Sequence, residues 1–239
     1  MFGELHDNPI SHWLQLELTK DLCKLKKDSL VLGAEMFESD NQLILDEYLS
    51  GMITTGRFEG EARLWPNYKT DYRPLVEFAK SNKLQFVATN VPKRYASLIN
   101  SKGFEGLEEL SDEAKKFIPP LPIAYDPELN CYKSMLEMDG GMGSHITPNF
   151  PKAQAIKDAT MAHFLLQNWS PGKLFIHFNG AYHSDNFESM NWYLKRANPD
   201  LKIITITTVS QEEIKELLEE NTGKADFTIC VVDNMTSSK

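Results

Sequence analysis

Cysteine is scarce in this chain of 239 residues, and its three copies are scattered at Cys23, Cys131 and Cys230. No CxxC pair or other close metal-binding spacing occurs, and an odd, scattered set does not make a disulfide framework. These cysteines are interpreted as small buried hydrophobic residues. Long hydrophobic runs are missing as well, because no apolar stretch reaches the ~18 residues needed to span a bilayer.

Clustered positive charge is also absent. The chain has 25 basic and 34 acidic residues, a net charge of −9, and no dense Lys/Arg patch. Because neutralising phosphates requires a basic face, this composition excludes nucleic acid as the expected partner. The chain has no Gly-x-Ser-x-Gly elbow and no HExxH motif. The glycine-rich residues 140–143 neither follow a strand nor carry the lysine of a phosphate-binding loop.

Strand and helix patterns alternate along most of the chain. Asn8 and Pro9 predict the start of a helix that runs to about residue 27. Strands are predicted at 29–37, 84–89, 173–179, 202–209 and 227–232. Helices are predicted after Ser39 or Asp40, at 73–81, from Pro92, and at 152–169, 185–197 and 211–220. This alternation predicts an α/β fold with a mostly parallel sheet and helices on both faces.

The middle of the chain differs, because residues 103–150 contain no good strand signal. An acidic helical piece at 106–117 is followed by a proline-rich stretch and a Gly/Met-rich loop at 138–145. We therefore predict an α/β core domain made of residues 1–102 and 151–239, with a helical insertion subdomain at 103–150. Such inserted segments often cover a functional site.

One four-residue pattern, Gly-x-x-His, occurs near both ends of the chain, at Gly3–His6 and Gly180–His183. Each copy lies where an apolar stretch stops and a helix is expected to begin. In an open α/β sheet that junction is the carboxyl end of a strand, where ligands and catalytic groups collect. We expect His6 and His183 to open onto one shared cavity.

Carboxylates accompany both motifs. Glu4 lies two residues before His6, so in a strand both side chains point to the same side. Glu35 ends an apolar run and cannot easily be buried as an unpaired charge, so it is a ligand, an acid/base group or half of an ion pair. His12 is expected to flank the same cleft. Asp158 shares a helical face with Gln154 and needs a partner such as a histidine or an arginine.

Aromatic residues gather on two segments, with Trp65, Tyr68 and Tyr72 on one and Tyr125 and Tyr132 on the other. They predict either the walls of a site for a flat apolar ligand or aromatic packing under a long loop. His145, on the Gly-rich loop, either swings over a ligand or is a solvated loop residue. His177, inside a predicted strand, is expected to belong to the core.

Several segments, taken together, resemble a known family. They are Gly3–Pro9 with His12, Gly33–Phe37, Trp65–Tyr68, Tyr72–Leu75, Ala153–Ala162 and Asn179–His183. The combination resembles the ChaN-like, iron-regulated haem-binding lipoproteins over nearly the whole chain. This resemblance implies a bacterial cell-envelope protein of haem and iron uptake, with two haems stacked face to face at a homodimer interface. It also implies that a tyrosine of one subunit holds the iron and that a histidine of the partner meets the propionates.

The resemblance does not place the haem ligands by motif. We predict Tyr125 or Tyr132 as the iron ligand and His145 as a propionate partner, because they lie on the insertion, and His12 as a further haem-site residue. Tyrosine ligation favours ferric iron, as suits carriage rather than catalysis. Because the chain opens as if inside a strand, we expect an export signal and a lipid anchor upstream of it.

The paired motifs also resemble a wider superfamily of metal-dependent Gly-x-x-His proteases and erythromycin-esterase-like hydrolases. The matching catalytic positions are Glu4, His6, Glu35 and His183, and a divalent metal would be held by His6, His183 and Glu35. An open metal site of this kind lowers the pKa of bound water. The alternative prediction is therefore a metal-dependent hydrolase.

Overall fold

The protein is built around a six-stranded sheet in the order β3-β2-β4-β1-β5-β6, and every strand pair is parallel. A computed structural model describes residues 1–137 and 147–238. The strands are β1 (Phe2–Glu4), β2 (Leu30–Glu38), β3 (Gln85–Asn90), β4 (Leu174–Gly180), β5 (Ile206–Gln211) and β6 (Phe227–Val232). The predicted α/β fold is confirmed, and the short first strand lies in the middle of the sheet.

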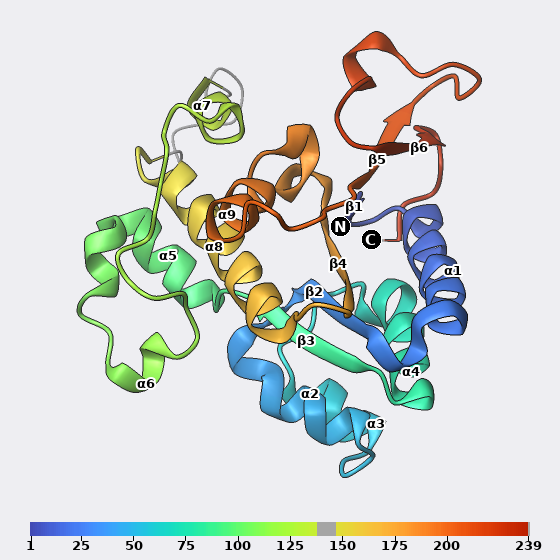
Figure 1. Cartoon of the computed structure of the whole chain (residues 1–239), viewed down its shortest axis with the longest axis horizontal. Coiled ribbons are helices and arrows are strands. Elements are labelled where there is room, and N and C mark those ends of the chain that lie inside the picture. The colour runs from blue at the N-terminus through green and yellow to red at the C-terminus, as the bar shows by residue number, and fades with distance from the viewer. Residues whose placement is uncertain (138–146, 239) are drawn as a thin grey trace.

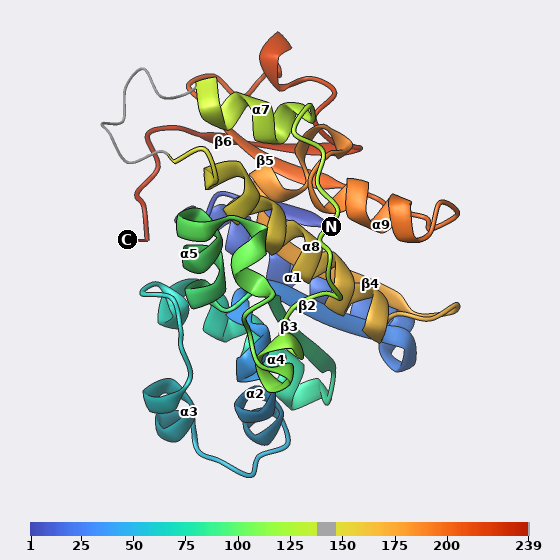
Figure 2. The same cartoon turned by 90° about the vertical axis from the view of Figure 1, so that its left-hand side faces the viewer.

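Helices cover both faces of this sheet, as predicted (Figures 1 and 2). One face carries α1 (Pro9–Lys26), α2 (Gln42–Leu49) and α4 (Arg73–Asn82), and the other carries α5 (Lys93–Lys102), α8 (Phe150–Asn168) and α9 (Met190–Ala197). The shorter α3 (Thr55–Glu61), α6 (Asp112–Lys115) and α7 (Asn130–Glu137) lie at the periphery. Within the described ranges, no helix is both long and apolar enough to cross a membrane.

Local sequence explains where these elements begin. The Asn8 side chain accepts a hydrogen bond from the backbone N–H of Ser11 at 3.0 Å, and Pro9 occupies the first turn of α1. This cap satisfies a backbone donor that would otherwise be unpaired. In β2, every residue from Leu30 to Phe37 is buried. Such a continuous run is typical of a parallel strand that is covered on both faces.

Each face of the sheet has its own core. Beside α2 and α4, the rings of Tyr48 and Phe58 stack at 4.5 Å between centroids, and Phe37 meets Phe86 edge-on at 5.5 Å. On the opposite face, a second cluster includes Ile99, Leu107 and Ile156. The sheet is therefore enclosed, and its strand ends are held in fixed positions.

The helix predicted at 211–220 is absent, which is a correction to the sequence analysis. The spacing of Ile214, Leu217 and Leu218 is helical, but these side chains are exposed by 50, 37 and 49% and cover no face. The side chain of Gln211 instead donates to the carbonyls of Glu213 and Glu216 and accepts from the N–H of Leu218. The segment is thereby organised as a loop.

Other predicted boundaries also change. The helix predicted at 185–197 begins only at Met190, because Asn186, Phe187 and Ser189 have positive φ angles that interrupt it. The strand predicted at 202–209 is β5, which begins at residue 206. The acidic piece at 106–117 contains the end of a 3-10 helix (Phe104–Leu107) and the short α6. The described parts of the predicted insertion, residues 103–137 and 147–150, contain α6, α7 and the first residue of α8, and no strand. Its separation as a subdomain stays a prediction.

Candidate functional site

The two Gly-x-x-His motifs interlock at the carboxyl ends of β1 and β4. The register pairs Gly3 with Asn179 and Glu4 with Gly180. A Cβ atom on Gly3 would lie 2.9 Å from Cα of Ala181, and a Cβ atom on Gly180 would lie 2.7 Å from the ring of His6. Each glycine, because it lacks a side chain, therefore leaves space that a residue of the other motif occupies. The sheet brings the two motifs together at adjacent strand ends, and the shared cavity expected for His6 and His183 stays a prediction.

His183 lies between two buried carboxylates. Its Nδ1 donates to Oδ1 of Asp158 on α8 at 2.6 Å, and its Nε2 lies 3.2 Å from Oε1 of Glu35 on β2. The other oxygen of Glu35 accepts the backbone N–H of Gly180 at 2.7 Å. Side-chain exposure is 4% for His183, 7% for Glu35 and 0% for Asp158. A residue of the second motif is thus held between a strand of the sheet and a helix that covers one of its faces.

The charges in this cluster stabilise one another. Burial alone would lower the pKa of His183, but Glu35 and Asp158 raise it to about 10. Burial opposes ionisation of Glu35, yet the charge and hydrogen bond of His183 hold its pKa well below the usual range. For Asp158, burial dominates and raises the pKa. His183 is therefore an imidazolium at neutral pH and has no free lone pair for a metal or a substrate proton.

Two further residues complete this side of the cluster. The hydroxyl of Tyr132, which is fully buried, donates to Oδ2 of Asp158 at 2.8 Å. The amide of Gln154 lies 3.1 Å from Nε2 of His183. Gln154 and Asp158 thus share one helical face, as their spacing predicted, and the partner that Asp158 required is a histidine. The Tyr132 hydroxyl is therefore already engaged in a hydrogen bond within the protein.

A second cluster surrounds Glu4, which is buried. Glu4 accepts hydrogen bonds from Nδ1 of His6 at 3.0 Å, from Nε2 of Gln15 at 2.5 Å, and from the hydroxyl of Tyr72. Burial opposes its charge, but the hydrogen bond from His6 and the nearby His12 lower its pKa overall. Despite its own desolvation, His6 has a raised pKa because Glu4 and Glu35 lie close. The influence of Glu35 on His6 links the two clusters.

His12 lies within the second cluster. Its ring nitrogens are 3.2 Å from Oε1 of Gln15 and 3.1 Å from the carbonyl oxygen of His6, and the residue is 5% exposed.

His177 belongs to the core, as predicted: it is fully buried, it contacts Thr89, and burial lowers its pKa to about 4.

His6 is the most exposed of these side chains. Its side chain is 36% accessible, whereas that of Glu4 is 2% accessible. The indole of Trp65 packs edge-on against the imidazole with ring centroids 4.8 Å apart. A ligand that approaches from solvent therefore meets His6 and Trp65 before any carboxylate.

The predicted metal set does not assemble into a recognisable centre. Within residues 1–137 and 147–238, no group of three or more His, Cys, Asp or Glu side chains is arranged to hold a metal ion. His183 and Glu35 bind each other, with Nε2 and Oε1 3.2 Å apart. The divalent metal of the alternative prediction therefore stays a prediction.

Of the predicted haem residues, Tyr125 reaches the His183 cluster only through its ring, which packs against Tyr132. It is half-buried, its ring packs 5.4 Å from that of Tyr132 and 5.7 Å from that of Phe104, and burial raises the pKa of its hydroxyl. Within the described ranges its hydroxyl makes no hydrogen bond. His145 lies outside the described residues.

Sequence reasoning missed the contacts of Gln15 and Tyr72 with Glu4. A signal was present for Gln15, because Ser11, His12, Gln15 and Thr19 place polar side chains on one face of α1, and all four are buried. A buried polar stripe of this kind indicates a hydrogen-bonded network. Tyr72 offered no such signal, because a tyrosine among aromatic residues also predicts ordinary packing.

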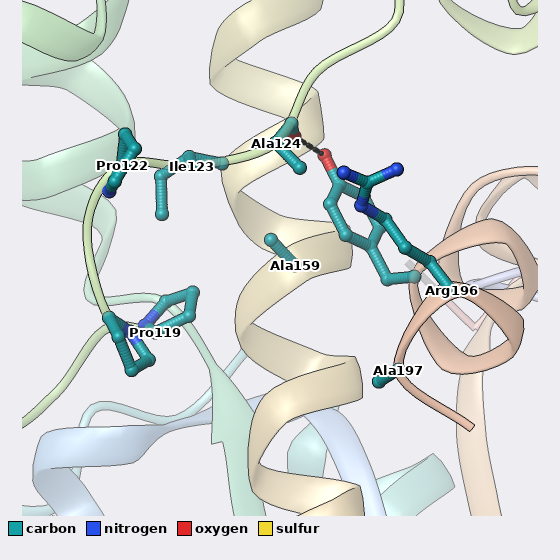
Figure 3. A pocket seen from close by; sticks show the side chains of 9 residues that line it. Pro119, Pro122, Ile123, Ala124, Ala159, Arg196 and Ala197 are labelled. Carbon is teal, nitrogen blue, oxygen red and sulfur yellow. Dashed lines mark hydrogen bonds between the residues drawn. The ribbon is translucent and has the colours of Figure 1, made fainter.

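A groove of about 340 Å³ opens elsewhere, between α9 and the proline-rich segment 119–124 (Figure 3). Ala159 of α8 lies on its wall, whereas the adjacent Asp158 points to His183, so α8 presents the two in different directions. The Tyr193 hydroxyl donates to the carbonyl of Ala124 at 2.8 Å and ties the two sides together. Among the described residues that line this groove, Arg196 is the one charged residue, so they offer no acid/base pair.

The fold and the interlocked motifs define a known class of protein. Residues 1–194 match the family described as haem-binding uptake, Tiki superfamily, ChaN. The chain belongs to this family. No curated protein matches it significantly.

Two solved structures match this chain, and the first is similar in fold. One is described as cofacial haem binding to ChaN of Campylobacter jejuni, with 15% identity, 95% of this chain and 84% of that chain covered, and a TM-score of 0.68. The other is a mutant of the erythromycin esterase EreC in its open conformation, with 13% identity, coverage of 84% and 66%, and a TM-score of 0.46.

Proposed function

We propose that this protein binds haem as part of haem or iron uptake. The observation that carries the proposal is the family match over residues 1–194. The fold similarity to ChaN of Campylobacter jejuni is consistent with it. A homodimer, a lipid anchor and a place in the bacterial cell envelope are part of the same proposal.

Tyr125 is our choice of iron ligand over Tyr132. The Tyr132 hydroxyl is buried and donates to Asp158, whereas Tyr125 is half-buried with a hydroxyl that makes no described hydrogen bond. Aromatic neighbours around Tyr125 suit a flat apolar disc. A phenolate oxygen is a fitting donor for ferric iron, and when bound the haem would supply the iron that is carried. His145 stays a prediction as a propionate partner, and His12 stays a prediction as a further haem-site residue.

The test is a titration of the purified chain with hemin, followed by the visible absorption spectrum. We expect a Soret band with the high-spin signature of tyrosinate ligation. Tyr125→Phe should remove that signature, and Tyr132→Phe, the matched control on the adjacent ring, should keep it. An unchanged hemin spectrum would reject haem binding altogether. Loss of the signature in Tyr132→Phe alone would make Tyr132 the iron ligand, and the proposal of haem binding would still hold.

A hydrolase is the second candidate, and one observation favours it. Buried Glu4 orients His6, the most exposed histidine of the clusters, as a carboxylate orients a catalytic imidazole. We expect any hydrolysis of an activated ester to disappear in His6→Ala. Elemental analysis decides whether a metal takes part: a stoichiometric divalent ion that is lost in His6→Ala and in His183→Ala would support the metal-dependent version.

A further inference from the structure

Helix α7, which neighbours Tyr125, has no capping side chain of its own. It begins after Leu129, whose carbonyl accepts the backbone N–H groups of Tyr132 at 3.0 Å and Lys133 at 2.9 Å. The side chain of Leu129 has no acceptor atom, so it cannot satisfy the unpaired N–H groups at the start of the helix. A helix of eight residues is also too short to be stable without tertiary contacts. The position of α7 therefore depends on residues from elsewhere in the chain.

Glu188 supplies the missing cap from a distant turn. Its Oε2 accepts the backbone N–H of Cys131 at 2.6 Å, and its Oε1 lies 3.3 Å from the backbone N–H and from the side-chain amide of Asn130. One carboxylate thus pairs two N–H groups of α7, and its negative charge suits the positive end of the helix. The carbonyl of Cys131 accepts the hydroxyl of Tyr182, which belongs to the second Gly-x-x-His motif. This motif and the turn that follows it therefore hold both backbone groups of Cys131.

The turn that carries Glu188 is strained. Asn186, Phe187 and Ser189 have φ angles of 57°, 58° and 53°, in the left-handed region that residues with a side chain rarely adopt. Such strain persists only where surrounding contacts hold it, and it is concentrated at sites that position a functional group. Here the Ser189 hydroxyl donates to the carbonyl of Tyr182 at 3.2 Å. The backbone is thereby fixed in the conformation in which Glu188 reaches the start of α7.

Helix α7 in turn holds the ring of Tyr125. Tyr132, on the first turn of α7, packs against that ring with centroids 5.4 Å apart, and Phe104 packs against it at 5.7 Å. Tyr132 is also fixed from α8, because its hydroxyl donates to Asp158 at 2.8 Å. Within the described ranges the hydroxyl of Tyr125 makes no hydrogen bond, so these ring contacts determine where it points.

We propose that Glu188 is a positioning residue for the iron ligand of the haem site. By capping α7 it holds Tyr132, and through the ring of Tyr132 it holds the Tyr125 hydroxyl in place. This inference rests on the proposed function, because it takes Tyr125 as the iron ligand. It gives the turn after the second Gly-x-x-His motif a part in haem binding, although Glu188 acts only through α7.

Hydrogen exchange of the haem-free chain tests the cap. In Glu188→Ala the amides of Asn130 and Cys131 lose their acceptor, and we expect the amides of α7 to exchange about tenfold faster or more. Those of α8 should be unchanged. Glu188→Gln keeps an acceptor oxygen and should restore part of the protection. Glu128→Gln is the matched control: it removes the same charge next to α7, but the Glu128 side chain pairs with Lys133 at 3.0 Å and not with a backbone N–H of the helix.

The rate of hemin loss tests the link to the iron ligand. The hemin-loaded chain is mixed with excess apomyoglobin, whose Soret band reports the hemin that leaves. We expect Glu188→Ala to weaken the tyrosinate signature and to lose hemin about tenfold faster than the unaltered chain, with Glu188→Gln between the two. A double variant separates positioning from general stability. If Glu188 acts through Tyr125, Glu188→Ala combined with Tyr125→Phe should lose hemin no faster than Tyr125→Phe alone.

Three results would overturn the role of Glu188 and leave haem binding intact. They are exchange of the α7 amides that Glu188→Ala does not change, loss of hemin from Glu188→Ala at the rate of the unaltered chain, and additive rates of hemin loss in the double variant. By contrast, an unaltered chain that does not bind hemin would reject the proposed function, and the positioning role with it.

Discussion

The imidazole of His6 occupies the space where a side chain on Gly180 would begin. The ideal Cβ position of Gly180 lies 2.7 Å from both Cε1 and Nε2 of that ring. Since Gly180 also donates its N–H to Glu35, one backbone position supports both clusters of the site. The second motif needs its glycine because of the histidine in the first motif.

Gly180→Ala should therefore displace His6 and destabilise the protein by ~1–3 kcal/mol, as overpacking of a tight site does. Chemical denaturation measures the free energy of unfolding, and the NMR signals of the His6 ring report its displacement. Gly60→Ala is the matched control, because a Cβ there meets nothing within 4 Å. It lies in α3 and should be neutral or slightly stabilising. Equal effects of the two variants would contradict the packing of His6 on Gly180.

Replacing His183 should remove a pH-dependent part of the stability. Its folded pKa of about 10 lies above the ordinary 6.5, so its stabilising contribution is complete below pH 6.5 and is lost as the pH rises toward 10. Glu35 has a lowered pKa, so its contribution is present above its ordinary 4.5 and is lost in acid. Together, the two contributions are greatest between pH 4.5 and 6.5.

We expect His183→Gln to lower the free energy of unfolding by ~3–5 kcal/mol near pH 6, because two buried carboxylates lose their cation. The deficit should shrink as the pH approaches 10. Denaturation across this pH range measures it. His163→Gln is the control: burial lowers the pKa of His163, so this variant should show no such trend above pH 6.5. A deficit that is constant between pH 6.5 and 10 would refute the raised pKa of His183.

Tyr132→Phe should destabilise the apoprotein by ~1–3 kcal/mol, because the buried carboxylate of Asp158 loses a hydrogen bond. Tyr125→Phe should have a much smaller effect, since no described hydrogen bond is lost. Thermal unfolding without hemin gives both values. A larger loss in Tyr125→Phe would show that the two tyrosines have exchanged roles.

Gln42→Ala should uncap the β3 edge. The N–H of Ala88 and the C=O of Phe86 would lose their partner, at a cost of ~1–3 kcal/mol, and the chain should aggregate more readily. Chemical denaturation measures the loss of stability, and light scattering during heating measures the aggregation. Gln167→Ala changes an exposed glutamine on α8 and should stay within ~0.5 kcal/mol of the unaltered protein. Indistinguishable behaviour of the two variants would mean that Gln42 does not protect the edge.

The order of elements and the positions of strand ends were readable from local pattern. Asn8 and Pro9 predicted the start of α1, and apolar runs that stop at polar residues predicted β2 and β4. These signals depend on short-range chemistry, namely helix capping and burial on two faces, which a single segment carries within itself. The same reasoning placed Glu4, Glu35 and both motif histidines at strand ends.

Which of these groups meet was settled by the fold. The sheet order puts β4 between β2 and β1, and this placement alone brings Glu35 to His183 and His6 to Gly180. Tertiary structure also decides that residues 211–220 form a loop. Their apolar residues have helical spacing, but Ile214 and Leu217 pack against no other element, and the side chain of Gln211 binds the backbone of the segment. Pairing between distant segments depends on sheet order and on available surface, and neither is a property of any one stretch of sequence.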